Sequence, residues 1–129
     1  MDDFYRQHIL DHYQNPRNYG VLEDPDISYQ EANPLCGDVI RIDLRLNDSH
    51  VKEVRFSGVG CAISRASASM LTEMVEGRSL EELKALSKED VLEALGIEIG
   101  PVRLKCALLP LKVLKVGVYG LDHGPEEEE

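Results

Sequence analysis

Three cysteines and one aspartate are the residues of this chain best suited to metal or sulfur chemistry. The cysteines are Cys36, Cys61 and Cys106, and Asp38 follows the first of them by two positions. Thiolates are soft ligands that prefer zinc and iron-sulfur clusters, and a carboxylate can complete a set of four ligands. The residue types therefore predict a metal site that holds either zinc or an iron-sulfur cluster.

The spacing of the cysteines does not identify the kind of site. Cys61 follows Cys36 by 25 residues and Cys106 follows Cys61 by 45, so neither pair forms the compact Cys-x-x-Cys motif of structural zinc modules. Taken singly, a free cysteine is often an inert, buried residue. Three cysteines cannot all pair within one chain, which favours reduced thiols and a cytoplasmic location over a disulfide framework.

The local sequence around the cysteines favours reactivity over burial. Cys36 lies in a turn-rich stretch directly before a predicted strand, and Cys61 follows Gly58 and Gly60 at a predicted strand-to-helix junction. Cys106 lies in the first turns of a predicted helix. Helix N-termini favour an anionic thiolate, and glycines let the backbone approach a bound group closely. Simple turn formation explains the glycines equally well.

A β-hairpin is the first element that must position these residues. Residues 39–46 alternate between apolar and charged side chains, which predicts a half-buried strand. Residues 47–49 have turn composition, and residues 51–57 alternate again, so the two runs are expected to pair as antiparallel strands. The inner face of the first strand should carry Ile40, Ile42, Leu44 and Leu46, and its outer face Arg41, Asp43 and Arg45.

Five segments have helical signals. They are residues 3–13, residues 62–76 with Met70 and Met74 in the core, a short segment capped by Ser79 and Glu82, residues 87–95 capped by Ser87, and a last helix from Pro101 to about Gly117. Helices combined with one hairpin predict the α+β class, with a small antiparallel sheet against which the helices pack.

Composition limits the other possibilities. The chain of 129 residues is long enough for one domain, expected over residues 1–120, and residues 121–129 read as an acidic, flexible tail. The net charge of -10 argues against nucleic-acid binding, which needs clustered basic residues. No apolar stretch approaches the roughly 20 residues of a membrane span, and the acidic N-terminus does not resemble a signal peptide.

Four segments resemble the signature blocks of the IscU/SufU family of iron-sulfur cluster assembly proteins, whose fold is that of the NifU N-terminal domain. They are residues 11–18, 33–38, 58–64 and 102–106, and they occur in the family's order. The resemblance runs from Tyr5 to about Leu114. It implies an α+β fold with a three-stranded sheet. It also implies a site in which sulfur from a cysteine desulfurase meets iron, made of Cys36, Asp38, Cys61 and Cys106.

The resemblance leaves two functions open. As a scaffold, the protein would assemble a [2Fe-2S] cluster and pass it to apo-proteins, with Asp38 keeping the site labile. As a SufU-like carrier, it would bind zinc while Cys106, on mobile backbone, accepts persulfide sulfur. Lys105 stands where IscU-type members have histidine, which favours the carrier. The absence of the insertion that SufU-type members carry between the second and third cysteines favours the scaffold. A structural zinc module is the third alternative.

Two further features are expected to lie outside the site. His8 and His12 fall four residues apart on one helical face, but no third ligand is near in sequence, so we expect them to be surface or packing residues. Tyr5 is an aromatic residue on the first predicted helix, where it could support a homo-oligomer.

Overall fold

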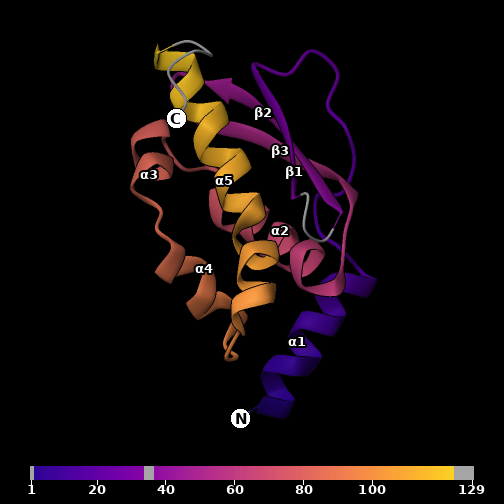
Figure 1. Cartoon of the computed structure of the whole chain (residues 1–129). Coiled ribbons are helices and arrows are strands. Elements are labelled where there is room, and N and C mark those ends of the chain that lie inside the picture. Colours follow the sequence, from indigo (N-terminus) through magenta and orange to yellow (C-terminus); the bar gives the residue numbers. More distant parts are fainter. Residues whose placement is uncertain (1, 34–36, 124–129) are drawn as a thin grey trace.

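The computed structural model describes residues 2–33 and 37–123, and side chains at 2–5, 102 and 120–123 are outside that description. It has a three-stranded antiparallel sheet in the order β1-β2-β3, with helices packed on one face (Figure 1). The predicted α+β class is confirmed. The strands are β1 (Ile27–Asn33), β2 (Asp38–Asn47) and β3 (His50–Val59), and the helices are α1 (Asp2–Gln14), α2 (Ala62–Val75), α3 (Leu80–Ala85), α4 (Lys88–Leu95) and α5 (Pro101–His123).

The predicted hairpin is confirmed as β2 and β3. Leu44 pairs with Val54 and Ile42 with Phe56, and all four side chains are buried. The turn between the strands contains Asp48 and Ser49, both with positive φ, as the tight turns favoured by hairpins require. Alternation of apolar residues therefore predicted both the pairing and the buried face of these strands.

The third strand, β1, was implied by the family resemblance and not by periodicity. Its burial is concentrated at the two ends, at Ile27 and Asn33, whereas the polar residues between them are exposed or half-buried. A strand at the edge of a sheet with this composition lacks the alternating signal of a half-buried strand. It pairs antiparallel with β2, from Ile27 opposite Leu44 to Asn33 opposite Asp38.

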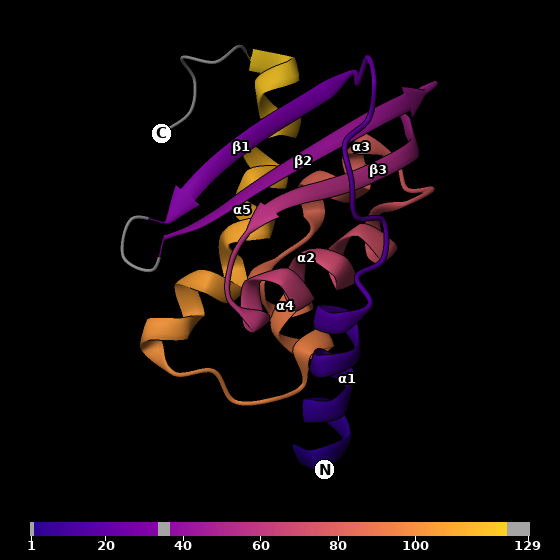
Figure 2. The ribbon, with the colours of Figure 1, turned by 90° about the vertical axis from the view of Figure 1, so that its right-hand side faces the viewer.

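The inner face of the sheet is covered by α2 and α5 (Figure 2). The two helices contact each other, and the Ser67 hydroxyl of α2 donates a 2.7 Å hydrogen bond to the Ala107 carbonyl of α5. Met70 is buried, as predicted, and Met74 is partly buried against the same core. Since Cys61 directly precedes α2 and Cys106 lies on α5, this helix pair sets the separation of two candidate ligands.

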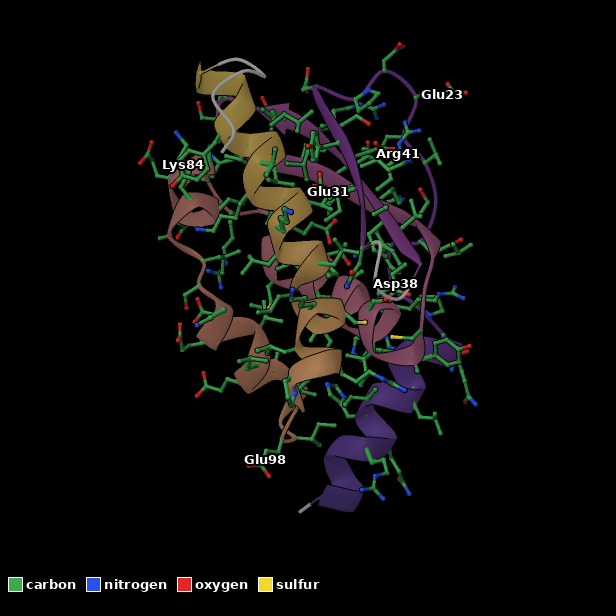
Figure 3. The ribbon with its side chains drawn as sticks, in the orientation of Figure 1. Glu23, Glu31, Asp38, Arg41, Lys84 and Glu98 are labelled. Carbon is green, nitrogen blue, oxygen red and sulfur yellow. The ribbon has the colours of Figure 1, made fainter. Side chains whose placement is uncertain are left out.

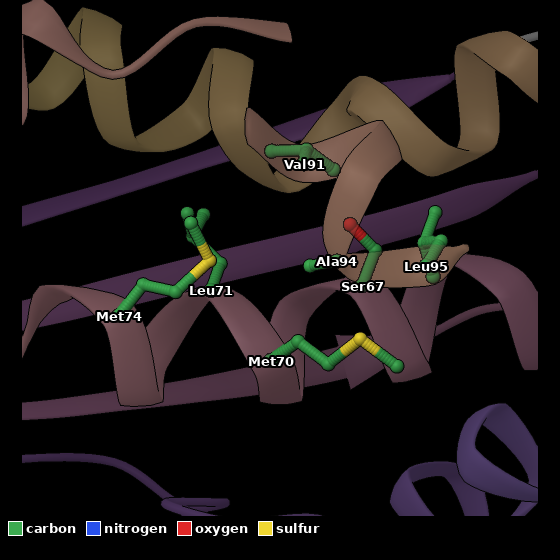
Figure 4. Close-up of a pocket in the computed structure, with 7 residues that line it drawn as sticks. All are labelled: Ser67, Met70, Leu71, Met74, Val91, Ala94 and Leu95. Carbon is green, nitrogen blue, oxygen red and sulfur yellow. The ribbon is translucent and has the colours of Figure 1, made fainter. Parts of the chain in front are cut away.

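The α2–α4 contact contains a small apolar pocket, which Figure 4 shows. It leaves no space for the centre of a water molecule, so the helices are in close contact there. The pocket is lined by Ser67, Met70, Leu71, Met74, Val91, Ala94 and Leu95. We interpret it as ordinary core packing.

The helix ends follow the sequence signals, with one exception. Ser79 and Ser87 form the predicted caps of α3 and α4, and Gly96 ends α4 in the left-handed conformation. The prediction that the last helix ends around Gly117 is wrong, because α5 continues to His123. A Cβ at Gly117 would lie 3.0 Å from the Ile27 Cγ2 atom, so this glycine permits close helix–strand packing and does not end the helix.

Of the predicted tail, residues 121–129, positions 124–129 lie outside the described residues. Among the helices described, none is long and apolar enough to cross a membrane.

Alternation placed Asp43 on the outer face of the sheet, where a charged side chain is expected to be solvated. In the structure it is buried. The segment between α1 and β1 crosses this side of the sheet (Figure 2), and Asp43 is only 1% exposed. Its carboxylate accepts hydrogen bonds from the Leu22 backbone N–H (3.1 Å), the Ser28 hydroxyl (2.6 Å) and Arg41 Nε (2.9 Å). Asp43 therefore fastens the crossing segment to β1 and β2.

Replacing Asp43 with alanine is expected to lower the free energy of unfolding by about 2–3 kcal/mol, because three donors lose a buried charged acceptor. Urea unfolding monitored by circular dichroism measures the change. Glu93→Ala, on an exposed position of α4, is the matched control and should change stability by less than about 0.5 kcal/mol. A loss of similar size in both variants would contradict the role of Asp43.

His12 proves to be a packing residue, in agreement with the expectation. Only 2% of it is exposed, and its Nδ1 lies 2.7 Å from the Ser69 hydroxyl of α2. Its ring also meets that of His8 edge to face. Burial lowers the pKa of His12 below its ordinary value of 6.5, and the positive charges of Arg17 and His8 act in the same direction, against a smaller opposing effect of Glu73.

This lowered pKa predicts that stability falls in mild acid. Well above pH 6.5 the ring is neutral in both states; as the pH falls through 6.5, the unfolded chain takes up a proton that folded His12 resists. The free energy of unfolding should therefore fall by up to about 1.4 kcal/mol between pH 7.5 and 5.5 from this group. His12→Gln should remove that share, whereas His50→Gln, at the exposed hairpin turn, should not. Identical dependence of the free energy of unfolding on pH in the parent and His12→Gln would contradict this role of His12.

Candidate metal and sulfur site

Asp38 is the first residue of β2 and faces the helical layer (Figure 3). The preceding residue, Gly37, has φ 77° and donates its backbone N–H to the Asn33 carbonyl at 2.8 Å, which closes the turn between β1 and β2. Asp38 is 3% exposed. The turn thus places a buried carboxylate at the end of the sheet nearest the start of α2.

Cys61 occupies the N-cap position of α2, and its side chain does not cap the helix. Instead, its backbone N–H donates to Asp38 Oδ1 at 3.1 Å, and its Sγ lies 3.6 Å from Asp38 Oδ2. The Cys61 thiol is thus within donating distance of the Asp38 carboxylate, at the N-terminus of α2. Cys61 is half-buried, and a partner molecule can therefore reach its sulfur more readily than a fully buried one.

Cys106 lies in the second turn of α5 and is 1% exposed. The expectation that a partner can reach the Cys106 sulfur is therefore not met, because this position is buried. Its neighbours Arg103 and Lys105 are exposed. Any reaction of the Cys106 sulfur with a second protein therefore requires this position to become exposed.

The structure brings three of the four predicted ligands together. One ligand atom from each of Asp38, Cys61 and Cys106 lies within 4.8 Å of the other two. A tetrahedral zinc ion with sulfur at about 2.3 Å and oxygen at about 2.1 Å would hold those two atoms about 3.6 Å apart. The Cys61 Sγ to Asp38 Oδ2 separation is 3.6 Å. The donor set and its spacing therefore fit zinc or iron.

Cys36, the fourth predicted ligand, lies outside the described residues, as do its neighbours at positions 34 and 35. Its role stays a prediction. Among the residues that the structure describes, His8 and His12 do not belong to the group that could hold a metal.

Two glycines make the approach of Cys61 to Asp38 possible. A Cβ at Gly60 would lie 2.3 Å from the Ser64 hydroxyl and 3.3 Å from Asp38 Cγ. Gly58 has φ 126°, and a Cβ there would lie 2.0 Å from the Val39 carbonyl oxygen. A side chain at Gly58 would push β3 away from the start of β2, and one at Gly60 would displace the side chains of Ser64 and Asp38. These glycines therefore serve the site as well as the turn.

Ser64 is the site residue that sequence reasoning did not single out. Its hydroxyl donates to the Cys61 carbonyl at 3.2 Å and lies 3.9 Å from Cys61 Sγ. The available signal was its position three residues after Cys61, in the first turn of α2. It is fully buried and helps fix the backbone of Cys61.

Comparison with protein families matches residues 4–125 to the model described as NifU-like N terminal domain. The chain is 42% identical to a protein named zinc-dependent sulfurtransferase SufU from Bacillus subtilis, covering 92% of this chain and 91% of that protein. It is 36% identical to the iron-sulfur cluster assembly scaffold protein IscU of Escherichia coli, with 88% and 91% covered.

Solved structures share the fold. A SUF-system scaffold protein from Fervidobacterium islandicum superposes with a TM-score of 0.76 at 23% identity and covers 87% of this chain and 94% of that one. The N-terminal part of a NifU-like protein from Brucella abortus gives a TM-score of 0.75 at 23% identity, over 99% of this chain and 98% of that one. The three-stranded sheet with its helical layer is thus a known architecture.

Proposed function

Because the chain belongs to the family of NifU-like N-terminal domains, we propose that it is an iron-sulfur cluster assembly scaffold. It receives sulfur from a cysteine desulfurase, assembles a cluster on Cys36, Asp38, Cys61 and Cys106, and passes the cluster to apo-proteins in the cytoplasm. The observation that supports this most strongly is the convergence of a carboxylate and two cysteine sulfurs from β2, the start of α2 and α5 within 4.8 Å.

Anaerobic reconstitution tests the scaffold function. The purified chain is incubated with ferrous iron and sulfide, desalted, and examined by visible absorption. We expect cluster absorption in the parent and in Ser79→Ala, a cap substitution on α3 remote in sequence from the site, and its loss in Cys61→Ser. If the parent shows no such absorption after desalting, or if Cys61→Ser shows it undiminished, the scaffold proposal is wrong.

A second candidate function is that of a zinc-dependent sulfur carrier. It is supported by the 42% identity to the Bacillus subtilis sulfurtransferase over nine tenths of both chains, and by Lys105, which cannot replace the histidine expected before the third cysteine of a scaffold. In this function Asp38, Cys61, Cys106 and Cys36 would hold zinc, which would order the site around its thiolates.

The sulfur transfer itself is a thiol–disulfide type exchange. A thiolate of this chain attacks the outer sulfur of the donor's persulfide; the new S–S bond forms on this chain, the donor's S–S bond breaks, and the donor leaves as thiolate. No net oxidation occurs. Cys106 is the acceptor that we propose, and because it is 1% exposed, the transfer includes a movement that exposes its sulfur.

The carrier function predicts that the chain accelerates a cysteine desulfurase. We expect sulfide release in the presence of a reductant to rise severalfold on adding the parent protein, and to return to the basal rate with Cys106→Ser. Mass spectrometry of the chain after reaction without reductant should find the added sulfur on Cys106. If the rate does not rise and no cysteine carries sulfur, the donor partnership proposed for both functions is excluded.

A further inference from the structure

Arg65 has an unusual environment beside the site. It lies one helical turn after Cys61 on α2, and its backbone N–H donates to the Cys61 carbonyl at 3.1 Å. Its guanidinium carbon lies 5.5 Å from the ring centre of Tyr13, near the end of α1, and 5.3 Å from that of Tyr19, in the segment that follows. Cation–π contacts with two rings hold the guanidinium in place.

The guanidinium lacks an acceptor within the part of the chain described. Arg65 Nε is buried and has no hydrogen-bond partner. No carboxylate of the described residues forms an ion pair with Arg65, whereas Arg17, Arg41, Arg45 and Arg55 each have one. The chain holds 24 acidic and 14 basic residues, so intramolecular acidic partners are abundant. An arginine held between two rings without one is suited to an acceptor from another molecule.

Exposed apolar side chains surround this cation. Tyr19 is 47% exposed and donates its hydroxyl to the Gly58 carbonyl at 3.4 Å, which places it against the end of β3, where Val59 is 65% exposed. Leu10, one turn before Tyr13 on α1, is 47% exposed. We call this surface the Arg65 patch; it consists of Leu10, Tyr13, Tyr19, Val59 and Arg65. Aromatic residues and arginine are the side chains most enriched where proteins bind each other.

We propose that the Arg65 patch is the docking surface for the sulfur-donating protein and that Arg65 binds a carboxylate of that protein. The inference rests on the proposed function, because a sulfur donor must bring its persulfide to a thiol of this chain, and Cys61 adjoins the patch. Charge complementarity selects the carboxylate, since the planar guanidinium binds it through two parallel hydrogen bonds. A second copy of the chain is a poor occupant, because both copies carry a net charge of -10 and repel each other.

Binding to the purified cysteine desulfurase of the same organism tests this assignment. Calorimetric titrations at low and high salt compare the parent with Arg65→Gln, Arg65→Lys and the matched control Arg78→Gln, which removes an exposed arginine in the connection between α2 and α3. We expect Arg65→Gln to weaken binding about tenfold or more at low salt and to reduce its salt dependence. Arg65→Lys should lie between the two, because lysine keeps the charge without the planar fork.

Val59→Asp keeps the assignment testable if Arg65→Gln disturbs the packing of α1. Val59 is largely exposed, so the variant should fold normally, and a carboxylate placed in the patch should weaken binding about tenfold. Zinc content should be unchanged in all of these variants. If both Arg65→Gln and Val59→Asp bind the desulfurase as tightly as the parent, the docking surface is wrong, and the proposed function is unaffected. Absence of binding by the parent would overturn the docking surface together with the proposed sulfur donor. If the parent forms a dimer and Arg65→Gln dissociates it, the patch binds a second copy of the chain, and the proposed docking of the sulfur donor is overturned.

Discussion

Serine in place of Cys61 or Cys106 is expected to reduce bound zinc from about one ion per chain to background. One ligand atom from each of the two cysteines and Asp38 lies within 4.8 Å of the others, so in the proposed site each sulfur would supply one of four ligands. A serine hydroxyl is a harder donor that stays protonated and binds zinc far more weakly than thiolate does. Each variant leaves at most three strong ligands, so water must complete the coordination and zinc is held more weakly.

Elemental analysis after zinc loading and desalting measures this effect. Ser64→Ala is the matched control, because Ser64 touches Cys61 without belonging to the group of possible ligands, and it should retain most of the metal. Cys36→Ser should behave like the other two cysteine variants, as the family resemblance implies. Thermal unfolding gives a second readout, since zinc should raise the midpoint of the parent and not of the variants. Full retention of zinc in any two of the three cysteine variants would refute the ligand assignment.

Alanine at Asp38 is expected to slow release of a reconstituted cluster to an apo-acceptor by about tenfold, on the scale of other changes to the surroundings of a metal ligand. A carboxylate is a harder donor than thiolate and holds iron less firmly, so Asp38 provides the exchangeable position at which an incoming thiolate can begin its attack. Without the Asp38 carboxylate, the incoming thiolate has more difficulty in entering this coordination position.

The structure adds a second role that must be separated from the first. Asp38 is buried and accepts the Cys61 backbone N–H at 3.1 Å, so Asp38→Ala should also lower the free energy of unfolding by about 1–2 kcal/mol. Asp38→Asn keeps an acceptor for that N–H but removes the carboxylate. Slow transfer in both variants supports the proposed role in release. Transfer as fast as the parent in Asp38→Ala, or slow transfer confined to it, would make Asp38 a residue that only shapes the turn.

Local patterns predicted those parts of the fold that depend on local interactions. Alternation located β2 and β3, and the capping residues Ser79 and Ser87 marked the starts of α3 and α4, because each feature depends on neighbours within a few residues. The burial of Asp43 could not be predicted this way. It depends on a segment some twenty residues earlier in the chain that crosses the outer face of the sheet. Gly117 resembled a helix end for the same reason, since the strand it packs against is distant in sequence.

The site was predictable only through the family resemblance. The separations of Cys61 from Cys36 and of Cys106 from Cys61, at 25 and 45 residues, contain no information about convergence, which the packing of α2 and α5 on the sheet produces. Physical reasoning from the residue types alone named the candidate ligands and a metal site, but it gave no reason for these residues to converge. The burial of Cys106 was not predicted, because a position near the start of a helix carries no information about the elements that pack against it.

X-ray absorption at the zinc edge of the purified, zinc-loaded chain tests most directly whether these residues form one metal site. We expect about three sulfur ligands at about 2.3 Å and one oxygen at about 2.0–2.2 Å. Cys61→Ser, if any zinc stays bound, should lose one sulfur from the shell. A first shell made mainly of nitrogen and oxygen in the parent, or an unchanged sulfur number in Cys61→Ser, would show that zinc binds elsewhere and would contradict the site.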